Sequence, residues 1–125
     1  MKSGFLLDTN TVIDYFNDRL PLAINEIIES TTPNFSVITR IELLAWPRAT
    51  IEQIQITQSF INNARILGME ESVILEAIQV RKKYKIKLPD AIIASTAIVN
   101  NLAIITNNVS DFSNIKKLEV INSFK

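Results

Sequence analysis

Four carboxylates stand where the sequence leaves an apolar run or begins a helix, and together they are candidates for metal chemistry. Asp8 follows "FLL", Glu42 follows "NFSVIT", Asp90 follows Pro89, and Asp111 lies just beyond "LAIITNN". Carboxylates that lie close together repel one another and raise each other's pKa. A divalent cation relieves this repulsion, and Mg²⁺ and Mn²⁺ prefer oxygen ligands. Such a cation activates water and stabilises a phosphoryl transition state.

Each of these acids also has an ordinary structural explanation. Asp8 suits an Asx-turn or a helix cap, and Asp111 stands among turn-forming residues. Thr39 and Glu42 have the spacing of a capping box. Asp90 in the first turn of a helix is favourable to the helix dipole. The prediction of a metal site therefore depends on the four acids in combination.

The composition excludes several other kinds of chemistry. The chain has no His and no Cys, which excludes catalytic triads with His, zinc sites with imidazole or thiolate ligands, and a disulfide framework. The formal net charge is zero, so there is no overall electrostatic footprint for nucleic acid. No apolar stretch approaches the roughly 20 residues of a membrane span, and the N-terminus has too short an apolar part for a signal peptide. We expect a cytoplasmic protein.

Two local groups of basic residues could still bind nucleic acid although the net charge is zero. Residues 81–87, "RKKYKIK", are rich in Lys and Arg and lie close in sequence to Asp90, so they could steer an RNA backbone. They also suit a solvated helix end, where positive charge complements the dipole. Arg40 and Arg48 lie near Glu42 in the sequence and face either phosphate or solvent. Both interpretations stay open for each group.

Predicted strands and helices alternate along the chain. Apolar runs bounded by turn residues indicate strands, and apolar residues spaced three or four apart indicate helices. The alternation predicts one α/β domain over 1–125, a sandwich with a mainly parallel sheet. In such a sheet, ligands bind beyond the carboxyl ends of the strands, so Asp8 and residues 106–111 should share an edge. The predicted strands are 5–7, 34–39, a brief one within 64–69, 102–106 and 118–122. The predicted helices are one that runs through 12–16 with Asp8 or Asn10 as its cap, and others at 21–28, 40–46, 51–64, 70–86 and 89–101.

The sequence resembles the PIN-domain proteins, and among them the small VapC-type toxins of bacterial toxin–antitoxin pairs. The stretches that carry the resemblance are "FLLDTNTVID", "SVITRIELL", "KLPDAIIASTAIVNNLAIITNNVSDF" and "LEVIN". The resemblance implies a three-layer sandwich in which helices flank a central five-stranded parallel sheet. It also implies an endoribonuclease dependent on Mg²⁺ or Mn²⁺, in which a metal-activated water attacks an RNA phosphodiester.

The resemblance also assigns roles to residues. It implies that Asp8, Glu42 and Asp90 are catalytic acids that bind the metal, Glu42 directly or through water. Many relatives carry a fourth acid at the position of Asn108, and here Asp111 supplies a carboxylate three residues later. We expect Asp111 to be the fourth acid, with Asn108 as a polar helper. Further residues expected to support the acids or contact the substrate are Thr9, Asn10, Thr106 and Arg40.

The resembled toxins also suggest partners. Their helices in the region matching 39–67 form a groove for the antitoxin and a dimer contact, so a VapB-type antitoxin and a homodimer are expected here. The alternative is that the apolar residues of this region belong to the core, as most such residues do. The residues concerned are Leu43, Leu44, Trp46, Ile54, Phe60 and Ile61.

Two other functions compete with the ribonuclease. "DTNT" resembles the haloacid-dehalogenase phosphatase pattern, in which a strand-end Asp, here Asp8, would be the nucleophile. That pattern has a second Asp two residues later, where this chain has Asn10. The other competitor is a non-catalytic PIN-fold module that binds RNA or protein. The retained acids argue against it, and Asn108 argues mildly for it.

Overall fold

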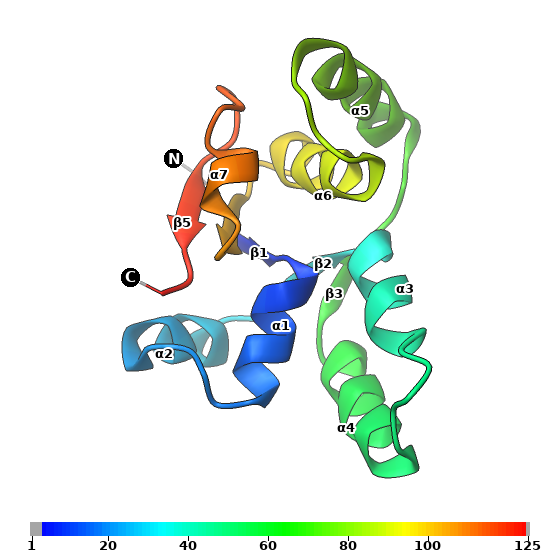
Figure 1. Ribbon diagram of the computed structural model, residues 1–125, viewed down its shortest axis with the longest axis vertical. Helices are drawn as coiled ribbons and strands as arrows, with labels where there is room; N and C mark the ends of the chain where they lie inside the picture. The colour runs from blue at the N-terminus through cyan, green and yellow to red at the C-terminus, as the bar shows by residue number, and fades with distance from the viewer. Residues whose placement is uncertain (1–3, 125) are drawn as a thin grey trace.

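The computed structural model describes residues 4–124 (Figure 1). Strands and helices alternate, as the sequence predicts. The strands are β1 (Phe5–Leu7), β2 (Asn34–Ser36), β3 (Arg65–Leu67), β4 (Ala103–Thr106) and β5 (Val120–Asn122). The helices are α1 (Thr9–Phe16), α2 (Leu22–Ser30), α3 (Val37–Leu44), α4 (Ile51–Asn62), α5 (Glu71–Lys83), α6 (Leu88–Val99) and α7 (Val109–Phe112).

The five strands form one sheet in the order β3-β2-β1-β4-β5, and every pairing is parallel. Because the strands are parallel, all their carboxyl ends lie along one edge of the sheet. In the central pair, Leu7 lies opposite Ile105, so Asp8 and Thr106 follow the paired positions of β1 and β4. The predicted parallel sheet flanked by helices is confirmed.

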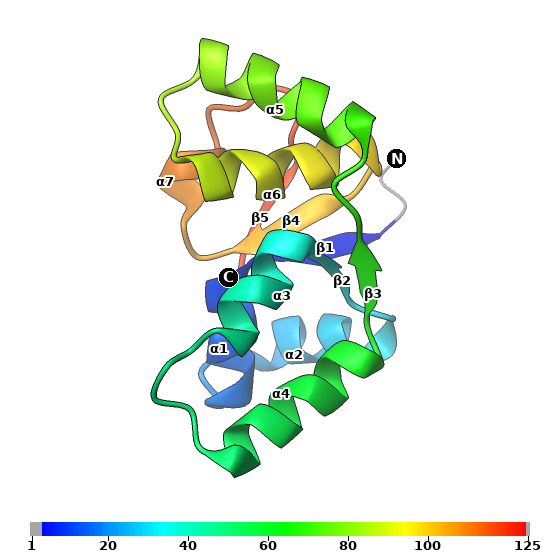
Figure 2. The ribbon, with the colours of Figure 1, turned by 90° about the vertical axis from the view of Figure 1, so that its right-hand side faces the viewer.

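The sheet is the middle of three layers (Figure 2). Helices α5 and α6 cover one face, and α1, α2 and α4 cover the other. Successive residues of a strand point to opposite faces. Accordingly, Leu6 and Ile104 pack with the α5–α6 side, whereas Leu7 and Ile105 pack with the α1, α2 and α4 side. Both faces are buried, which explains why these strands are apolar without alternation.

Local sequence signals account for several helix ends. Asp8 caps α1, because its side chain accepts a hydrogen bond from the backbone N–H of Thr11. Thr50 and Gln53 form a reciprocal capping box at the start of α4. Helix α5 begins with Glu71 and ends with the basic residues 81–83, as the helix dipole favours.

The start of α3 corrects one prediction. Ser36 caps this helix by accepting from the N–H of Ile38, so the helix begins at Val37 directly after β2. The strand therefore ends at Ser36 and not at Thr39, and the predicted capping box of Thr39 and Glu42 is wrong. Thr39 lies inside the helix and is fully buried. This shift frees Glu42 from a capping role.

Two further predictions need correction. The turn-forming residues around Asp111 predicted a turn, but Asp111 lies in the short helix α7. The core interpretation of the 39–67 region holds for Leu43 and Ile61, which are buried, but is wrong for Trp46, which is 52% exposed, and Ile54, which is 43% exposed. Leu44 and Phe60 are partly buried against the core.

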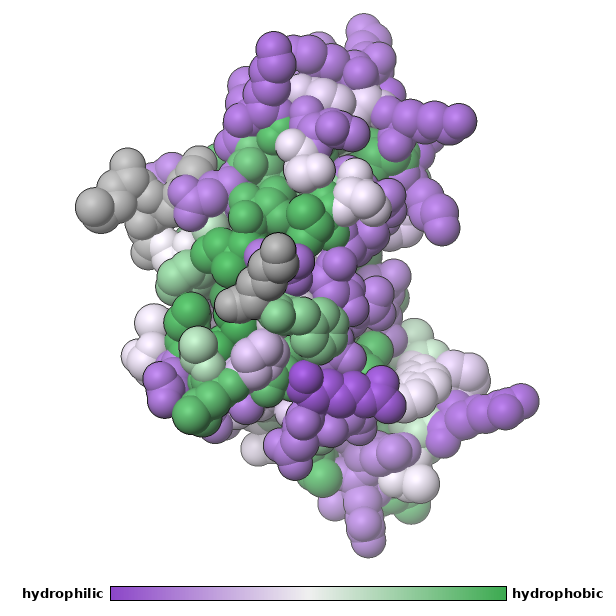
Figure 3. All heavy atoms as spheres, turned by 60° about the vertical axis from the view of Figure 1, so that its left-hand side comes forward, coloured by the Kyte–Doolittle hydropathy of each residue, from purple (hydrophilic) through white to green (hydrophobic). Residues whose placement is uncertain are grey.

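On the face that carries edge strand β5, apolar atoms gather in the middle with hydrophilic atoms above and below (Figure 3). Within residues 4–124, no helix combines the length and the hydrophobicity required to cross a bilayer.

Candidate metal and nuclease site

Asp8 is held rigidly at the carboxyl edge of the sheet. One carboxylate oxygen accepts the backbone N–H of Thr11 at 2.9 Å, and the other accepts the hydroxyl of Thr106 at the end of β4. The side chain of Thr11 in turn donates to the carbonyl of Ile105 at 2.9 Å. Asp8 is only 5% exposed, and this burial raises its pKa, while the hydrogen bonds from Thr106 and Thr11 lower it. Asp8 is therefore both the helix cap and a fixed carboxylate of the site.

Glu42 approaches Asp8 from α3. Its carboxylate accepts a hydrogen bond from the hydroxyl of Thr9, the residue directly after Asp8. Thr9 also lies 3.2 Å from the hydroxyl of the buried Thr39, one turn before Glu42 on the same helix. Two hydroxyls thus join the start of α1 to α3. Glu42 itself is exposed, so its carboxylate can change rotamer at little cost.

Asp90 lies in the first turn of α6 and is half-buried. Its pKa is raised, first by burial and then by repulsion from Asp111, Asp8 and Glu42, whereas the charge of Lys87 lowers it. Repulsion from all three acids means that each of them lies within electrostatic reach of Asp90. Asp8, Glu42 and Asp90, which come from three separate segments of the chain, line one pocket at this edge of the sheet.

The segment after β4 brings two further polar residues. The backbone N–H of Asn108 donates to the Thr106 hydroxyl at 2.9 Å, and its side-chain amide donates to the Asp111 carboxylate at 2.9 Å. Asn108 lines the same pocket as Asp8, Glu42 and Asp90, whereas Asp111 is exposed and does not line it. Asp111 is nevertheless the acid with the largest repulsive effect on Asp90. The expected roles of Asp111 as the fourth acid and of Asn108 as its polar helper stay predictions.

Seven residues at this edge of the sheet line a pocket of about 160 Å³, which we call the acidic pocket. It contains no Lys or Arg in its wall, so nothing in the wall neutralises its carboxylates. Arg40 is exposed on α3 and is not among the wall residues, so its predicted contact with substrate stays a prediction. The wall consists of Asp8, Thr9, Asn10, Glu42, Asp90, Ile93 and Asn108.

The donor set fits a hard divalent cation. Every polar group in the wall is a carboxylate, a hydroxyl or an amide, the oxygen donors that Mg²⁺ and Mn²⁺ prefer. The repulsion that raises the pKa of Asp90 is the repulsion that a cation removes. Within residues 4–124, no three carboxylates converge as closely as a shared ion would require. Mg²⁺ usually keeps several waters, so direct ligation by fewer carboxylates is sufficient.

Several residues of this site are not apparent from the sequence. Thr11 and Thr39 are fully buried and support Asp8 and Thr9 through hydrogen bonds. Asp14 is buried on α1, within 3.4 Å of the Asn107 amide, and its charge adds to the repulsion on Asp8. For Thr11, the spacing of three residues from a capping Asp was an available signal. For Asp14 and Thr39 we find none.

Comparison with known proteins gives the same fold. The PIN domain matches residues 5–118. The structure is similar to a chain of a toxin–antitoxin complex from Klebsiella pneumoniae, with 29% identity, a TM-score of 0.80 and coverage of 98% of this chain and 99% of that one. No curated protein matches the sequence significantly.

Two other similar structures belong to VapBC complexes. One is VapBC-1 from nontypeable Haemophilus influenzae, with 27% identity, a TM-score of 0.81 and coverage of 97% and 98% of the two chains. The other is VapBC2 from Rickettsia felis bound to a promoter DNA fragment, with 25% identity, a TM-score of 0.77 and coverage of 94% and 97%. The resemblance inferred from the sequence motifs is confirmed.

Proposed function

We propose that this chain, which belongs to the PIN-domain family, is a metal-dependent endoribonuclease and the toxin of a VapBC-type pair. The observation that carries the proposal is the convergence of Asp8, Glu42 and Asp90 in one pocket without a basic residue in its wall. PIN and VapC proteins are nucleases as a class, which supports hydrolysis of a nucleic acid. The polar groups of the pocket wall suit an ion and a phosphodiester, because all of them are carboxylates, hydroxyls or amides.

The acids at this site would have different roles in binding the ion. Two carboxylates would hold Mg²⁺ or Mn²⁺: Asp8, which Thr11 and Thr106 fix, and Asp90 in the first turn of α6. The side chains of Asp111 and Glu42 are exposed, so their carboxylates could turn toward the ion. When bound, such an ion polarises phosphoryl oxygens and lowers the pKa of a bound water.

Other side chains position these acids and the substrate. Thr9 orients the Glu42 carboxylate, and Asn108 holds Asp111 in place. Asn10 is exposed in the pocket wall, where its amide can donate to a phosphate oxygen. Because the ion supplies a water of lowered pKa, the absence of His from the chain is no obstacle to hydrolysis.

A paired measurement of metal binding and RNA cleavage tests this proposal. In Asp90→Asn, Mn²⁺ binding measured by calorimetry should weaken, and cleavage of a labelled RNA should fall about 10³-fold or more, since several kcal/mol of charge stabilisation are lost. Asp18→Asn is the matched control, because Asp18 is exposed outside the acidic pocket and has a positive φ of 55°, which Asn tolerates well. Full activity in Asp90→Asn would refute the role of that acid.

The same experiment separates the competing functions. A non-catalytic module would bind RNA without Mn²⁺-dependent cleavage in the wild-type protein. A phosphatase would form a covalent phosphate on Asp8, which trapping would reveal. Both oxygens of Asp8 already accept hydrogen bonds from protein groups, an arrangement that favours a ligand over a nucleophile.

We also propose a VapB-type antitoxin partner, a homodimer and a cytoplasmic location. Support comes from the VapBC neighbours and from apolar side chains left exposed on α3, α4 and the loop between them, among them Ile41, Trp46 and Ile51. Beside Trp46 lies a groove of about 230 Å³ that also includes Ile13, Phe16 and Ile56. Trp46→Ser should abolish co-purification with a co-expressed VapB-type antitoxin while leaving Mn²⁺ binding unchanged. Retained co-purification would remove this surface from the interface.

A further inference from the structure

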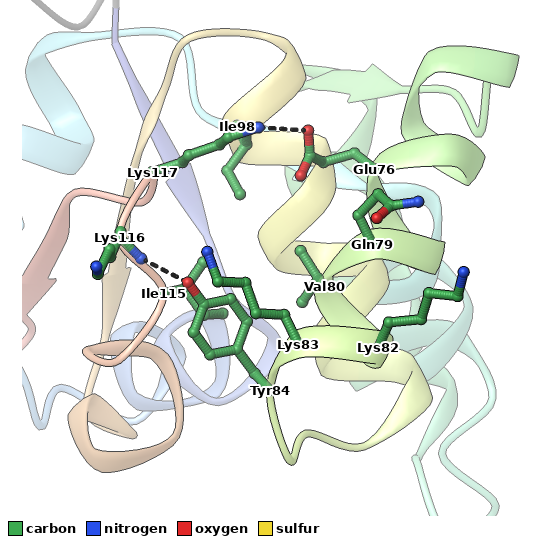
Figure 4. A pocket seen from close by; sticks show the side chains of 10 residues that line it. All are labelled: Glu76, Gln79, Val80, Lys82, Lys83, Tyr84, Ile98, Ile115, Lys116 and Lys117. Carbon is green, nitrogen blue, oxygen red and sulfur yellow. Dashed lines mark hydrogen bonds and ion pairs between the residues drawn. The ribbon is translucent and has the colours of Figure 1, made fainter.

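A second pocket, of opposite charge, lies between α5 and the loop that precedes β5 (Figure 4). Its volume is about 350 Å³, and four of its ten wall residues are lysines, against a single acid, Glu76. We call it the lysine pocket. The lysines are Lys82, Lys83, Lys116 and Lys117.

Most of this positive charge is not neutralised. Lys117 pairs with Glu76 at 3.5 Å, which is the only ion pair within residues 4–124. Lys82, Lys83 and Lys116 have no carboxylate within ion-pair distance and are exposed. In a chain with no net charge, this is a local excess of three positive charges. An excess of this kind attracts a polyanion at long range.

The pocket is a formed feature and not a chance gathering of surface lysines. The hydroxyl of Tyr84 accepts the backbone N–H of Lys116 at 3.3 Å and so ties the loop to the end of α5. The ammonium of Lys83 lies 5.7 Å from the centre of the Tyr84 ring. Val80 and Ile115 are buried beneath and hold the two elements together. The lysines are therefore presented by a fixed frame.

The lysines are spread out rather than focused on one point. In Figure 4, Lys83 extends over the Tyr84 ring, whereas Lys82 and Lys116 extend away on opposite sides. A single phosphate ion would be bound best by converging donors. A spread of separate charges suits a chain with repeated phosphates, since each ammonium can contact one phosphate independently.

A short loop joins the helix that carries part of the lysine pocket to the helix that carries Asp90 of the acidic pocket. Tyr84 ends α5, and a short loop containing Lys85 and Lys87 leads to Asp90 on α6. Lys87 is the N-cap of α6, three residues before Asp90. Two lysines and no acid therefore lie in the segment between Lys83 and Asp90.

We propose that the lysine pocket binds the phosphate backbone of the RNA strand at nucleotides that flank the bond to be cleaved. The proposal rests on the proposed function, because it assigns the path that the substrate takes to that site. The contacts would be to phosphates alone, so they would add affinity without sequence preference. An acidic protein segment is the alternative occupant. It is disfavoured because the loop with Lys85 and Lys87 leads to a pocket whose wall carries three acids, which would repel an acidic protein segment.

Direct binding measurements without metal test this proposal independently of cleavage. The probe is a 5′-fluorescein-labelled 20-nucleotide RNA, followed by anisotropy in EDTA over a range of salt concentrations. In Lys83→Gln/Lys116→Gln, the Kd at about 100 mM salt should rise about tenfold, and the slope of log K against log salt should flatten by about 1.4, or 0.7 for each lost contact. Lys83→Arg/Lys116→Arg should restore both values, because it keeps the charge.

Arg19→Gln/Arg65→Gln is the matched control, since both residues are exposed, lie outside the two pockets and carry the same total charge. Its Kd should change less than about twofold. Equal Kd and slope in the lysine variant and this control would overturn the proposal, as would displacement of the RNA by a poly-glutamate peptide at equal charge concentration. Thermal unfolding verifies that each variant is folded.

A cleavage assay with Mn²⁺ distinguishes the two proposals. If the lysine variant binds RNA less well but the wild-type protein does not cleave, the proposed function fails and RNA docking stands. If the wild-type protein cleaves and the lysine variant has an unchanged KM for the 20-nucleotide RNA, docking fails alone. The expected result is a raised KM with unchanged kcat for the 20-nucleotide RNA, and a smaller effect on a four-nucleotide substrate, which offers fewer phosphates.

Discussion

The acidic pocket and the lysine pocket differ in how the protein holds their charges. In the acidic pocket, Asp8 is buried and both of its oxygens are fixed by hydrogen bonds from Thr11 and Thr106. In the lysine pocket, Lys83 and Lys116 are exposed, and only the frame beneath them is fixed. The first arrangement defines a position for a small ion. The second defines a surface for a long, flexible polyanion.

The difference follows from where each pocket lies in the fold. The acidic pocket stands at the carboxyl ends of β1 and β4, where the pairing of Leu7 with Ile105 brings the next residues, Asp8 and Thr106, to the same edge. The lysine pocket stands between a helix and a loop that are 32 residues apart in the chain and are joined by the Tyr84 hydroxyl. Sheet edges therefore suit precise chemistry, and helix–loop junctions suit adaptable binding.

The largest contrast between the pockets should appear in Asp8→Asn. Asn is also a good helix cap, so the fold should survive, but one metal-binding charge is lost. We expect kcat for RNA cleavage to fall about 10³-fold or more. RNA binding in EDTA should be unchanged or tighter, because a negative charge has been removed. Loss of RNA binding together with cleavage would mean that the two pockets do not act separately.

The positions of Asp8 and Asp90 could be predicted because they follow from local rules. Apolar runs identified β1 and β4, and the parallel arrangement then required Asp8 and Thr106 to share an edge. Pro89 correctly indicated the start of α6 and so the place of Asp90. These inferences needed no knowledge of how distant side chains pack.

The errors occurred where two local rules competed or where packing decided. Ser36 and Thr39 both suit a helix cap, and pairing of β2 with β3 through Ser36 and Leu67 decided in favour of Ser36. Helical periodicity made Trp46 and Ile54 apolar candidates for the core, but no element covers them. The lysine pocket depends on Lys116 meeting Tyr84, a contact that no sequence pattern predicts.

A second prediction concerns the rigidity of Asp8. Thr106→Val preserves the shape of a fully buried strand residue but removes the hydroxyl that donates to Asp8 and accepts from the Asn108 N–H. We expect Mn²⁺ affinity, measured by calorimetry, to fall about 10–100-fold, as for other groups that orient a metal ligand. RNA binding to the lysine pocket should not change.

Thr96→Val is the matched control for this variant. Thr96 is equally buried, but its hydroxyl donates to the Ile92 carbonyl within α6. A similar loss of Mn²⁺ affinity in both variants would indicate a general effect on stability. A loss confined to Thr106→Val would show that a fixed Asp8 is what separates the acidic pocket from the adaptable lysines.

A third prediction uses the pH dependence of stability. Burial and repulsion raise the pKa of Asp90 above its ordinary value of 3.8. The stability linked to this group is therefore fully present below pH 3.8 and is lost as the pH rises through the raised pKa. In EDTA at pH 7, Asp90→Asn should melt above the wild-type protein, by less than about 5 °C because solvent screens a half-buried group.

The difference in melting temperature should disappear as the pH falls towards 3.8, where both proteins are neutral at this position. Saturating Mn²⁺ should reverse the order at pH 7, since only the wild-type protein gains the full binding energy. For the lysine pocket no such reversal is expected, because Lys83→Gln removes no metal ligand. A lower melting temperature for Asp90→Asn in EDTA would contradict the repulsion among the acids.

The smallest predicted effect joins the two pockets. Lys87 is exposed between them, and its charge lowers the pKa of Asp90. Lys87→Gln should raise this pKa further, so the acidic limb of the pH–rate profile should move to higher pH. The rate should fall by no more than about fivefold at any pH, as expected for one exposed charge. Lys85→Gln, with the same change two residues earlier, is the control, and an equal shift there would mean that general charge, rather than contact with the acidic pocket, links the two regions.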